Sequence, residues 1–464
     1  MHDAGTPMAD IALTLGLAAF VAAPPFDTAP DDVSPVIRNG FTDTLAALLG
    51  GRAEPVTQAA LHTVRHRRLD DGATEYVTGL HLDPAAAAFV NGVAAHALDY
   101  DDMALNGHPS VVLVPALLAA SEPAGASDAA LLRAYLVGYE VWAELNAREP
   151  DSLHGKGWHP TCVIGTVAAA AAVAHLRGLD AASAGHALGI AASLAGGLMG
   201  NFGSMTKPLH AGWAAAHGIE AVQLAEAGVT ASADILESPT GFLAAFSPAG
   251  RADRGPLVPG GTLQIRSNGL SVKKYPVCYA SHRVIDGVID LRQQHGLRAA
   301  DIARITATIS DVNARVLHSH APQDALQAKF SLEFACAMAL LEGAVGLPEV
   351  TDAQVHRADL QTLMTRVTVA TVPPGCPVEP SFALNDQVVI TLHDGTRFDS
   401  GPIRFARGHA LLPLSGADLA SKFMGCVAPP EHQAAGALLK ALQAMGSHSG
   451  GELYDTLRAF AAAG

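Results

Sequence analysis

The chain has 464 residues, of which 49% are hydrophobic and only 16% charged, so it can bury a large core and divide into two domains. Aromatic residues make up only 5%, whereas alanine and glycine are abundant, which favours helices packed closely through small side chains. The 29 Lys and Arg against 44 Asp and Glu give a formal charge of −15. This balance argues against a nucleic-acid partner, because phosphate binding needs a concentrated basic surface.

The first apolar run, residues 11–23 (IALTLGLAAFVAA), has the length of a signal-peptide core. The segment before it holds Asp3 and Asp10 but no lysine or arginine, so the positive n-region of a signal peptide is missing. We therefore expect an amphipathic helix that Pro24 ends. No other apolar run approaches the roughly 18 to 20 residues of a membrane span, so we expect no membrane partner.

The cysteines are odd in number, scattered and without a CxxC pair. This pattern is typical of free thiols in a reducing cytoplasm and predicts no zinc site. The cysteines are Cys162, Cys278, Cys336, Cys376 and Cys426.

Helical signals fill the chain up to about residue 245. Asp83 and Pro84, for example, supply a cap and a first helical position. The expected helices cover residues 41–51, 83–102, 127–145, 161–178, 180–197 and 209–228.

The pattern changes after residues 247–261, which are rich in Gly and Pro and predict a linker. Strand signals then cover residues 303–310, 366–372 and a hairpin over 387–398 that turns at Asp394–Gly395, with helices at 284–296 and 330–343. These signals predict a mainly α protein with an all-helical domain over 1–262, a smaller α+β domain over 263–404, and helices within 405–464 that pack back on the first domain.

A helix over residues 84–100 would place His96 and Asp99 on one polar stripe beside small residues. Both could simply satisfy one another or a helix end. The loop that follows, DYDDMALNGHPS, adds Asp101 and Asp102 and then His108. A second loop, HGKGWHPT (154–161), repeats the His-Pro-Ser/Thr pattern at His159. Proline after histidine holds each side chain at a helix entrance, where anions are attracted, although a plain capping loop is the alternative.

Lys207 stands in an almost charge-free stretch, GSMTKPLHAGWAAAHG (203–218). Because it precedes Pro208, we expect it to be extended at the mouth of a helix starting near Leu209 and to bind a carboxylate. A snorkelling surface lysine is the alternative. His210 is expected to support Lys207, and His217 to be structural.

The cluster SVKKYPVCYASH (271–282) opens the second domain. His282 and Lys274 could bring charge to a cleft between the domains, a usual place for small-ligand sites. Cys278 lies beside aromatic residues without a helix entrance, which favours burial over a nucleophilic role. Two other histidine pairs, His62/His66 and His318/His320, predict basic or solvated surface, not a metal site.

Five motifs together resemble the MmgE/PrpD family, which includes 2-methylcitrate dehydratase, cis-aconitate decarboxylase and iminodisuccinate epimerase. They are FVNGVAAHALDYDD…GHPS, GWHPT, GNFGSMTKPLHAG, KKYPVCYASH and AKFSLE, in this order. The resemblance implies a large helical domain, a smaller α+β lid domain, a homodimer, a site in the cleft between domains, and no metal or organic cofactor. Carried over by motif, the catalytic positions are Asp99, His108, His159, Lys207 and His282, and the substrate-binding positions are Lys274, His210 and Thr206.

The family chemistry implies removal of a proton from carbon next to a carboxylate or imine of a small di- or tricarboxylate. GHPS, GWHPT and NFGSMTKPLH resemble iminodisuccinate epimerase most, so we expect an epimerase. Decarboxylase-like members tend to have threonine where this chain has Met103, and a family tyrosine has no clear counterpart in residues 318–323. A dehydratase or decarboxylase of the family, and a noncatalytic carboxylate-binding member, are the alternatives.

Overall fold

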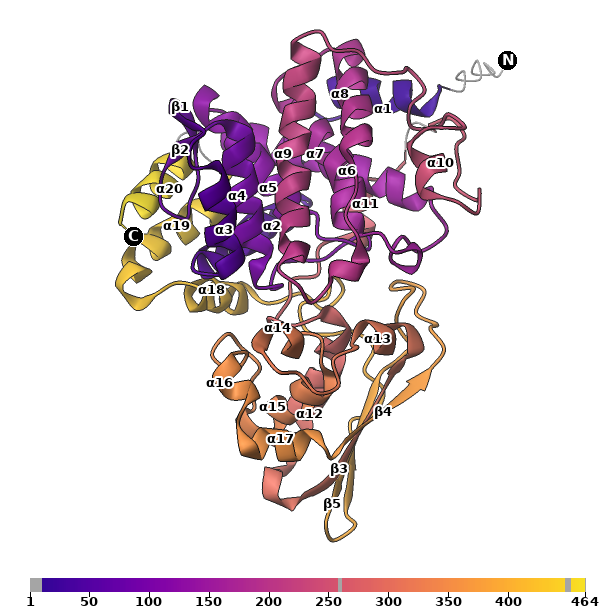
Figure 1. The fold of residues 1–464 in the computed structure, drawn as a ribbon, viewed down its shortest axis with the longest axis vertical. Coiled ribbons are helices and arrows are strands. Elements are labelled where there is room, and N and C mark those ends of the chain that lie inside the picture. Colours follow the sequence, from indigo (N-terminus) through magenta and orange to yellow (C-terminus); the bar gives the residue numbers. More distant parts are fainter. Residues whose placement is uncertain (1–10, 258–260, 447–451, 464) are drawn as a thin grey trace, which may run out of the picture. The chain divides into compact units, whose positions relative to one another are not determined.

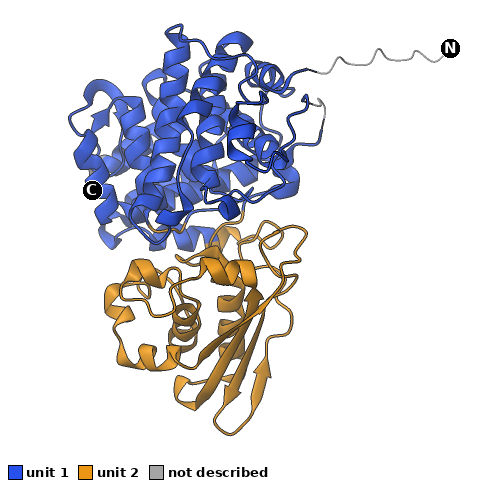
Figure 2. Cartoon of the chain, turned by 45° about the vertical axis from the view of Figure 1, so that its right-hand side comes forward, with its two compact units in different colours: residues 1–97, 101–270, 419–464 blue, residues 98–100, 271–418 orange. Residues whose placement is uncertain are grey.

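The computed structural model describes residues 11–257, 261–446 and 452–463 and divides them into two compact units (Figure 2). Unit 1 comprises the described residues up to 97, residues 101–270, and those from 419 on. Unit 2 comprises residues 98–100 and 271–418. The predicted boundaries, at 262/263 and 404/405, stay a prediction, and each unit is described here by itself.

Unit 1 is built mainly of helices (Figure 1). Its main-chain order up to residue 270 is α1 (Leu13–Ala22), α2 (Ser34–Gly51), α3 (Pro55–Val64), β1 (Arg68–Thr74), β2 (His81–Leu82), α4 (Pro84–Ala97), α5 (Ser110–Ser121), η1 (Glu122–Ala124), α6 (Asp128–Ala147), η2 (His154–Lys156), α7 (Pro160–Leu176), α8 (Ala181–Leu194), η3 (Met199–Asn201), α9 (Thr206–Glu226), α10 (Phe242–Phe246) and α11 (Gln264–Asn268).

Glycine and alanine let helix α9 pack closely between α4 and α7 (Figure 1). A Cβ added to Gly92 of α4 would lie only 2.9 Å from the Cα of Gly212 on α9. Gly218, farther along α9, meets Ala169 of α7 in the same way. The expectation of helices packed through small side chains is therefore confirmed. This close packing brings together the faces of three helices that carry or follow histidines.

Unit 1 is not purely helical, which corrects the prediction of an all-helical domain. Strands β1 and β2 pair antiparallel around a turn in which Glu75 is buried. The Glu75 carboxylate accepts hydrogen bonds from the backbone N–H groups of Val77, Thr78 and Leu80 at 2.9 to 3.2 Å. A two-residue strand held by one carboxylate leaves no periodic pattern in the sequence, so the sheet was missed.

The C-terminal helices pack on the first helices of unit 1 through ion pairs. Lys422 Nζ lies 2.6 Å from Asp43 Oδ1 of α2, and Arg52, which follows α2, lies 2.6 Å from Glu431. The elements are α18 (Gly416–Gly425), whose first three residues belong to unit 2, η6 (Pro429–Glu431), α19 (His432–Gln443) and α20 (Glu452–Ala463).

Unit 2 is an α+β layer structure with a sheet of order β4-β3-β5-β6, in which β3 runs parallel to β4 and antiparallel to β5. Its helices α12 and α15 pack on the sheet (Figure 1). The elements are η4 (Tyr279–Ser281), α12 (His282–His295), η5 (Ala299–Asp301), β3 (Ile302–Ser310), α13 (Asp311–Val316), α14 (Ala325–Ala328), α15 (Leu332–Glu342), α16 (Asp352–Val355), α17 (Ala358–Met364), β4 (Val367–Val372), β5 (Gln387–Leu392) and β6 (Arg397–Asp399).

The predicted hairpin is confirmed as β5 and β6, which turn at Asp394 and Gly395. Gly395 has φ of +87°, a conformation that favours glycine, and Asp394 Oδ1 accepts a hydrogen bond from Thr396 N at 2.9 Å. The strands predicted over 303–310 and 366–372 and the helices predicted over 284–296 and 330–343 are likewise present, within a few residues at each end.

All five cysteines are free thiols, as predicted. Burial raises the pKa of the Cys162 thiol to about 12. Among the described residues, no helix combines the length and the hydropathy that crossing a bilayer requires.

Candidate active site

The loop after α4 places one aspartate against two histidines. Asp101 is fully buried, with Oδ1 at 2.8 Å from His96 Nδ1 and Oδ2 at 2.7 Å from His108 Nδ1. His108 Nδ1 also lies 2.9 Å from the backbone carbonyl oxygen of Asp102. Carboxylate and carbonyl oxygens only accept, so both imidazoles carry hydrogen on Nδ1 and, when neutral, hold their lone pair on Nε2.

Charge and burial fix the protonation states around Asp101. Burial alone would raise the pKa of this carboxyl, but His96 and His108 hold it well below its usual range. Burial lowers the pKa of His96 to about 3, although the Asp101 charge opposes this shift. At neutral pH, Asp101 is therefore a carboxylate and His96 a neutral imidazole.

The loop itself is held in shape by backbone hydrogen bonds. Ala104 and Gly107 exchange two of them, at 3.0 and 2.9 Å, around Leu105 and Asn106, which have φ of +52° and +61°. The His108 N–H donates to Thr161 Oγ1 on α7 at 3.2 Å. This strained turn delivers His108 to the entrance of α5, and strain of this kind persists only where surrounding contacts enforce it.

A second pair of histidines lies at the start of α7 and on α9. His159 is extended (φ −98°, ψ 106°) with Pro160 at the first turn of α7, as predicted. Its Nδ1 lies 3.0 Å from His210 Nδ1. Burial, with the charge of Lys207, lowers the pKa of His159 well below its usual range and that of His210 to about 4. Because one hydrogen lies between two Nδ1 atoms, one ring presents a lone pair at Nε2 and the other an N–H.

The two pairs form a single cluster in unit 1. The ring centroid of His96 is 4.6 Å from that of His108 and 5.9 Å from that of His159. Ring nitrogens of these three histidines lie within 4.8 Å of one another, and the set could hold a divalent transition metal. The positive charge of Lys207, which lowers the pKa values of His96 and His159, opposes a second cation there. The absence of a metal stays a prediction.

Lys207 lies in the first turn of α9 and is 6% exposed, with its Nζ 5.4 Å from the ring centroid of Phe202. The prediction of an extended lysine before a helix at Leu209 is wrong, because α9 begins at Thr206. Pro208 is tolerated in this first turn, where its missing N–H has no helical acceptor. An ammonium at a helix N-terminus, lined by neutral imidazoles, still forms a site that attracts anions. Thr206 is half-buried at the same entrance.

The remaining predicted residues belong to unit 2. Helix α4 ends at Ala97, so Asp99 does not share a helical stripe with His96, which corrects that expectation. Asp99 has φ of +52°, and its carboxylate lies 2.7 Å from Lys273 Nζ. Lys273 is 1% exposed, whereas Lys274 is half-buried. The buried cation of this motif is therefore Lys273, and the substrate-binding role of Lys274 stays a prediction.

His282 is the first residue of α12 and is fully buried. Its Nε2 lies 3.3 Å from the Val277 carbonyl oxygen, and its ring centroid lies 5.1 Å from that of Tyr275 and 5.0 Å from that of Tyr279. Cys278 is half-buried. Of the predicted site residues, the structure thus brings together His108, His159, Lys207, His210 and Thr206 in unit 1 and places Asp99, Lys274 and His282 in unit 2.

Sequence reasoning missed four members of the unit 1 site. Asp101 was one of three nearby aspartates with nothing to rank it, and His96 was weighed only as a structural partner. His154 lies in η2 with its ring centroid 6.2 Å from that of His159, and its pKa is lowered by burial to about 4. Phe202 packs edge-on against His159 at 4.9 Å. His154 and Phe202 stood inside quoted motifs, HGKGWHPT and GNFGS, and that was the available signal.

The other histidine pairs lie on the surface, in agreement with the prediction. His62 and His66 are exposed. His318 and His320 are exposed in a loop, where His320 Nδ1 lies 2.9 Å from Glu333 Oε1.

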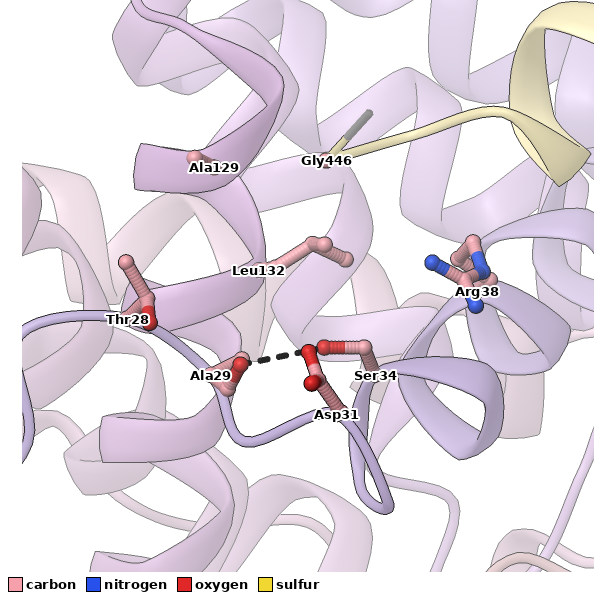
Figure 3. A pocket seen from close by; sticks show the side chains of 8 residues that line it. All are labelled: Thr28, Ala29, Asp31, Ser34, Arg38, Ala129, Leu132 and Gly446. Carbon is pink, nitrogen blue, oxygen red and sulfur yellow. Dashed lines mark hydrogen bonds between the residues drawn. The ribbon is translucent and has the colours of Figure 1, made fainter. Parts of the chain in front are cut away.

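A surface pocket of about 410 Å³ in unit 1 is separate from the histidine cluster (Figure 3). Two of its polar side chains bind backbone: Ser34 Oγ donates to the Ala29 carbonyl oxygen at 3.2 Å and Arg38 Nη1 to that of Met445 at 3.1 Å. No predicted site residue lines it. The lining residues are Thr28, Ala29, Asp31, Ser34, Arg38, Ala129, Leu132 and Gly446.

A buried group of neutral imidazoles beside a lysine ammonium defines an enzyme of acid–base chemistry on anionic substrates. The chain belongs to the MmgE/PrpD family: the N-terminal domain of that family matches residues 16–254, and its C-terminal domain matches residues 275–443. The family resemblance read from the motifs is thus confirmed, and the chain is an isomerase or lyase of this family.

Cis-aconitate decarboxylases are among its relatives. The Mus musculus enzyme is 35% identical over 74% of this chain and 71% of its own length. The Homo sapiens enzyme is 34% identical over 74% of this chain and 73% of its own length. The Aspergillus terreus enzyme is 26% identical over 62% of this chain and 64% of its own length.

Proposed function

We propose that this enzyme, without a cofactor, removes a proton from carbon next to a carboxylate or imine of a small dicarboxylate, and that its reaction is an epimerisation of the iminodisuccinate type. The observation that carries the proposal is the set of buried histidines with lowered pKa values around Lys207. A neutral imidazole at physiological pH is a base, and epimerisation begins with a base.

The site residues of unit 1 have the following roles in this reaction. His108, held by Asp101, removes the proton through Nε2. Lys207 binds a carboxylate and stabilises the enolate-like charge that develops on it. His159, paired with His210, returns a proton to the opposite face of the same carbon, since inversion needs a base on one face and a proton donor on the other. The proton taken by His108 and the proton given by the pair re-equilibrate with solvent before the next turnover. Thr206 binds substrate at the start of α9. Asp99, Lys274 and His282 are proposed as site residues from their family motifs.

Cis-aconitate decarboxylation is the second candidate, favoured by the names of the relatives. In that reaction the bond between carbon and a carboxylate breaks, carbon dioxide leaves, and the electron pair stays on carbon until a histidine protonates it. The first step needs no base, and the proton must come from a histidine already protonated. Epimerisation also needs a proton donor, but unlike decarboxylation it begins with a base, and the lowered pKa values of His96, His159 and His210 favour neutral, basic imidazoles. Dehydration of a 2-methylcitrate-type substrate also begins with a base and is the remaining lyase alternative.

Proton NMR in deuterated water with iminodisuccinate, 2-methylcitrate, cis-aconitate and citrate tests these candidates. Deuterium that enters an otherwise unchanged iminodisuccinate supports the epimerase. Loss of carbon dioxide or water from one of the others overturns it in favour of a lyase. Binding of a substrate without exchange or turnover would identify the noncatalytic alternative.

Lys207 variants separate charge from shape. Lys207→Ala should lower kcat/KM by about 10²-fold or more, because the substrate carboxylate loses its buried cationic partner. Lys207→Arg keeps the charge and should retain more activity than the alanine variant. Full turnover by Lys207→Ala contradicts the proposed role.

We further propose that the enzyme is a cytoplasmic homodimer, as its free thiols and family resemblance imply. Light scattering of the eluted protein should give twice the chain mass of 47.6 kDa. A monomer mass would contradict the dimer. The role of the α+β unit as a lid stays a prediction.

A further inference from the structure

One carboxylate serves two imidazoles in unit 1. We infer that Asp101 is a positioning residue: it holds His96 and His108 in the Nδ1–H tautomer and supplies the negative charge that makes His108 Nε2 a stronger base. The expected effect on turnover rests on the proposed function, whereas the tautomers can be measured without any substrate.

The geometry leaves little freedom in how hydrogens are placed. Each oxygen of Asp101 is used for a different ring, at 2.8 Å for His96 Nδ1 and 2.7 Å for His108 Nδ1. Both rings and the carboxylate are buried, with exposures of 1%, 6% and 0%. In this setting water cannot replace either contact, and the interaction is stronger than on a surface.

His108 and His96 are held differently, which makes the inference specific. His108 Nδ1 has a second acceptor, the Asp102 carbonyl oxygen at 2.9 Å. Among the described residues, the acceptor for His96 Nδ1 is Asp101 Oδ1. His96 Nε2 is buried and has no hydrogen-bond partner among the described residues. The tautomer of His96 therefore depends on Asp101 alone, whereas His108 keeps a second anchor.

The variant Asp101→Asn tests both the tautomers of the two histidines and the effect of Asp101 on turnover. An amide offers one acceptor and one donor in place of two acceptors. The amide oxygen should face His108, whose Nδ1 keeps its hydrogen for the Asp102 carbonyl, and the amide N–H should donate to His96 Nδ1. The hydrogen of His96 then moves to Nε2. Imidazole ¹⁵N chemical shifts report this change directly, and spectra of His96→Gln and His108→Gln assign the two rings.

The kinetic readout follows from the lost charge. Asp101→Asn should lower kcat by about 10²-fold with little change in KM, because His108 becomes a weaker base but Lys207 still binds the carboxylate.

Asp102→Asn is the matched control, because Asp102 is the next residue and is equally buried. Burial and the charge of Asp43 raise the pKa of Asp102 well above its usual range, so an amide resembles its protonated form. This variant should lose less than about 5-fold in kcat and leave both tautomers in place.

The inference is overturned by wild-type His96 carrying its hydrogen on Nε2, or by Asp101→Asn with wild-type kcat. Equal losses in Asp101→Asn and Asp102→Asn, with unchanged tautomers, would reduce Asp101 to a packing role and also overturn it. If no tested substrate turns over, the proposed function fails, and the ¹⁵N spectra still decide the tautomers.

Discussion

Lys273 Nζ lies 2.7 Å from Asp99 Oδ1 and 2.9 Å from the Asp99 carbonyl oxygen, so one buried ammonium binds both the side chain and the backbone of a residue with φ of +52°. A left-handed aspartate costs roughly 1 kcal/mol, and this double contact offsets the cost. The ion pair thus fixes the left-handed conformation of Asp99.

Removal of Lys273 should destabilise the protein strongly. Lys273→Met leaves the Asp99 carboxylate buried without its cation, and the free energy of unfolding in urea should fall by about 3 to 5 kcal/mol. The matched control is Lys274→Met, since Lys274 is adjacent and only half-buried, and its effect should stay within about 0.5 kcal/mol. Equal losses for the two variants would show that the ion pair does not matter.

The ion pair between Lys422 and Asp43 should hold the C-terminal helices in place. Both residues are buried, and Lys422 opposes the burial that raises the pKa of Asp43 to about 6. Lys422→Met should lower the free energy of unfolding by about 3 kcal/mol and speed amide hydrogen exchange in α18 and α19. Adding Asp43→Asn should restore most of the loss, because no unpaired carboxylate is left. A double variant no more stable than Lys422→Met argues against the pair.

The contact between α4 and α9 should not tolerate a methyl group. A Cβ at Gly212 would lie 2.5 Å from the Phe89 carbonyl oxygen, so Gly212→Ala must move one helix and should cost about 1 to 3 kcal/mol. Activity should fall too, since α9 carries Lys207 and His210. In Gly436→Ala, within α19, the Cβ would meet nothing within 4 Å, and stability should rise by up to about 1 kcal/mol. Thermal and urea unfolding of both variants measure the contrast.

His154 should make stability depend on pH. Its folded pKa is about 4, mainly because of burial, whereas an unfolded histidine titrates near about 6.5. Between these values the unfolded state binds more protons, so the His154 contribution to stability falls as the pH falls, and above about pH 6.5 it is constant. The free energy of unfolding of His154→Gln should therefore rise relative to wild type by about 1 kcal/mol per pH unit on going from pH 6.5 to 4.5.

Urea unfolding at a series of pH values measures this difference. His62→Gln, which changes an exposed histidine of α3, is the control for replacing a histidine by glutamine. A difference for His154→Gln that does not vary with pH would mean that His154 titrates alike in both states.

The sequence predicted those parts of the fold that depend on local bonds. Pro160 sets His159 in an extended conformation at the start of α7, and Asp83 caps α4 by accepting a hydrogen bond from Ala86 N at 3.2 Å. In unit 2, the alternation in residues 303–310 and the Asp394–Gly395 turn give β3 and the β5–β6 hairpin. These features need only residues within one turn or strand, so a linear pattern records them.

Predictions from local patterns were wrong where residues distant in the sequence determine a residue's conformation. The bias against a helical residue before proline did not hold at Lys207, because α9 begins one residue earlier and its first turn requires no N–H from Pro208. The helix through Asp99 was expected from apolar spacing, but Lys273, far along the chain, holds Asp99 in a left-handed conformation.

By itself, the sequence determined the family, the mainly helical class with an α+β part, and the loops that bring histidines to helix entrances, because these depend on ordered motifs and local propensity. Only the tertiary structure decided that Asp101 is the aspartate between His96 and His108, that Lys273 is the buried lysine of its pair, and that His159 pairs with His210. Neighbouring aspartates and lysines are equivalent in a linear pattern. Packing buries some of them, and a buried charge or imidazole must be satisfied by whichever group the fold places within hydrogen-bond reach.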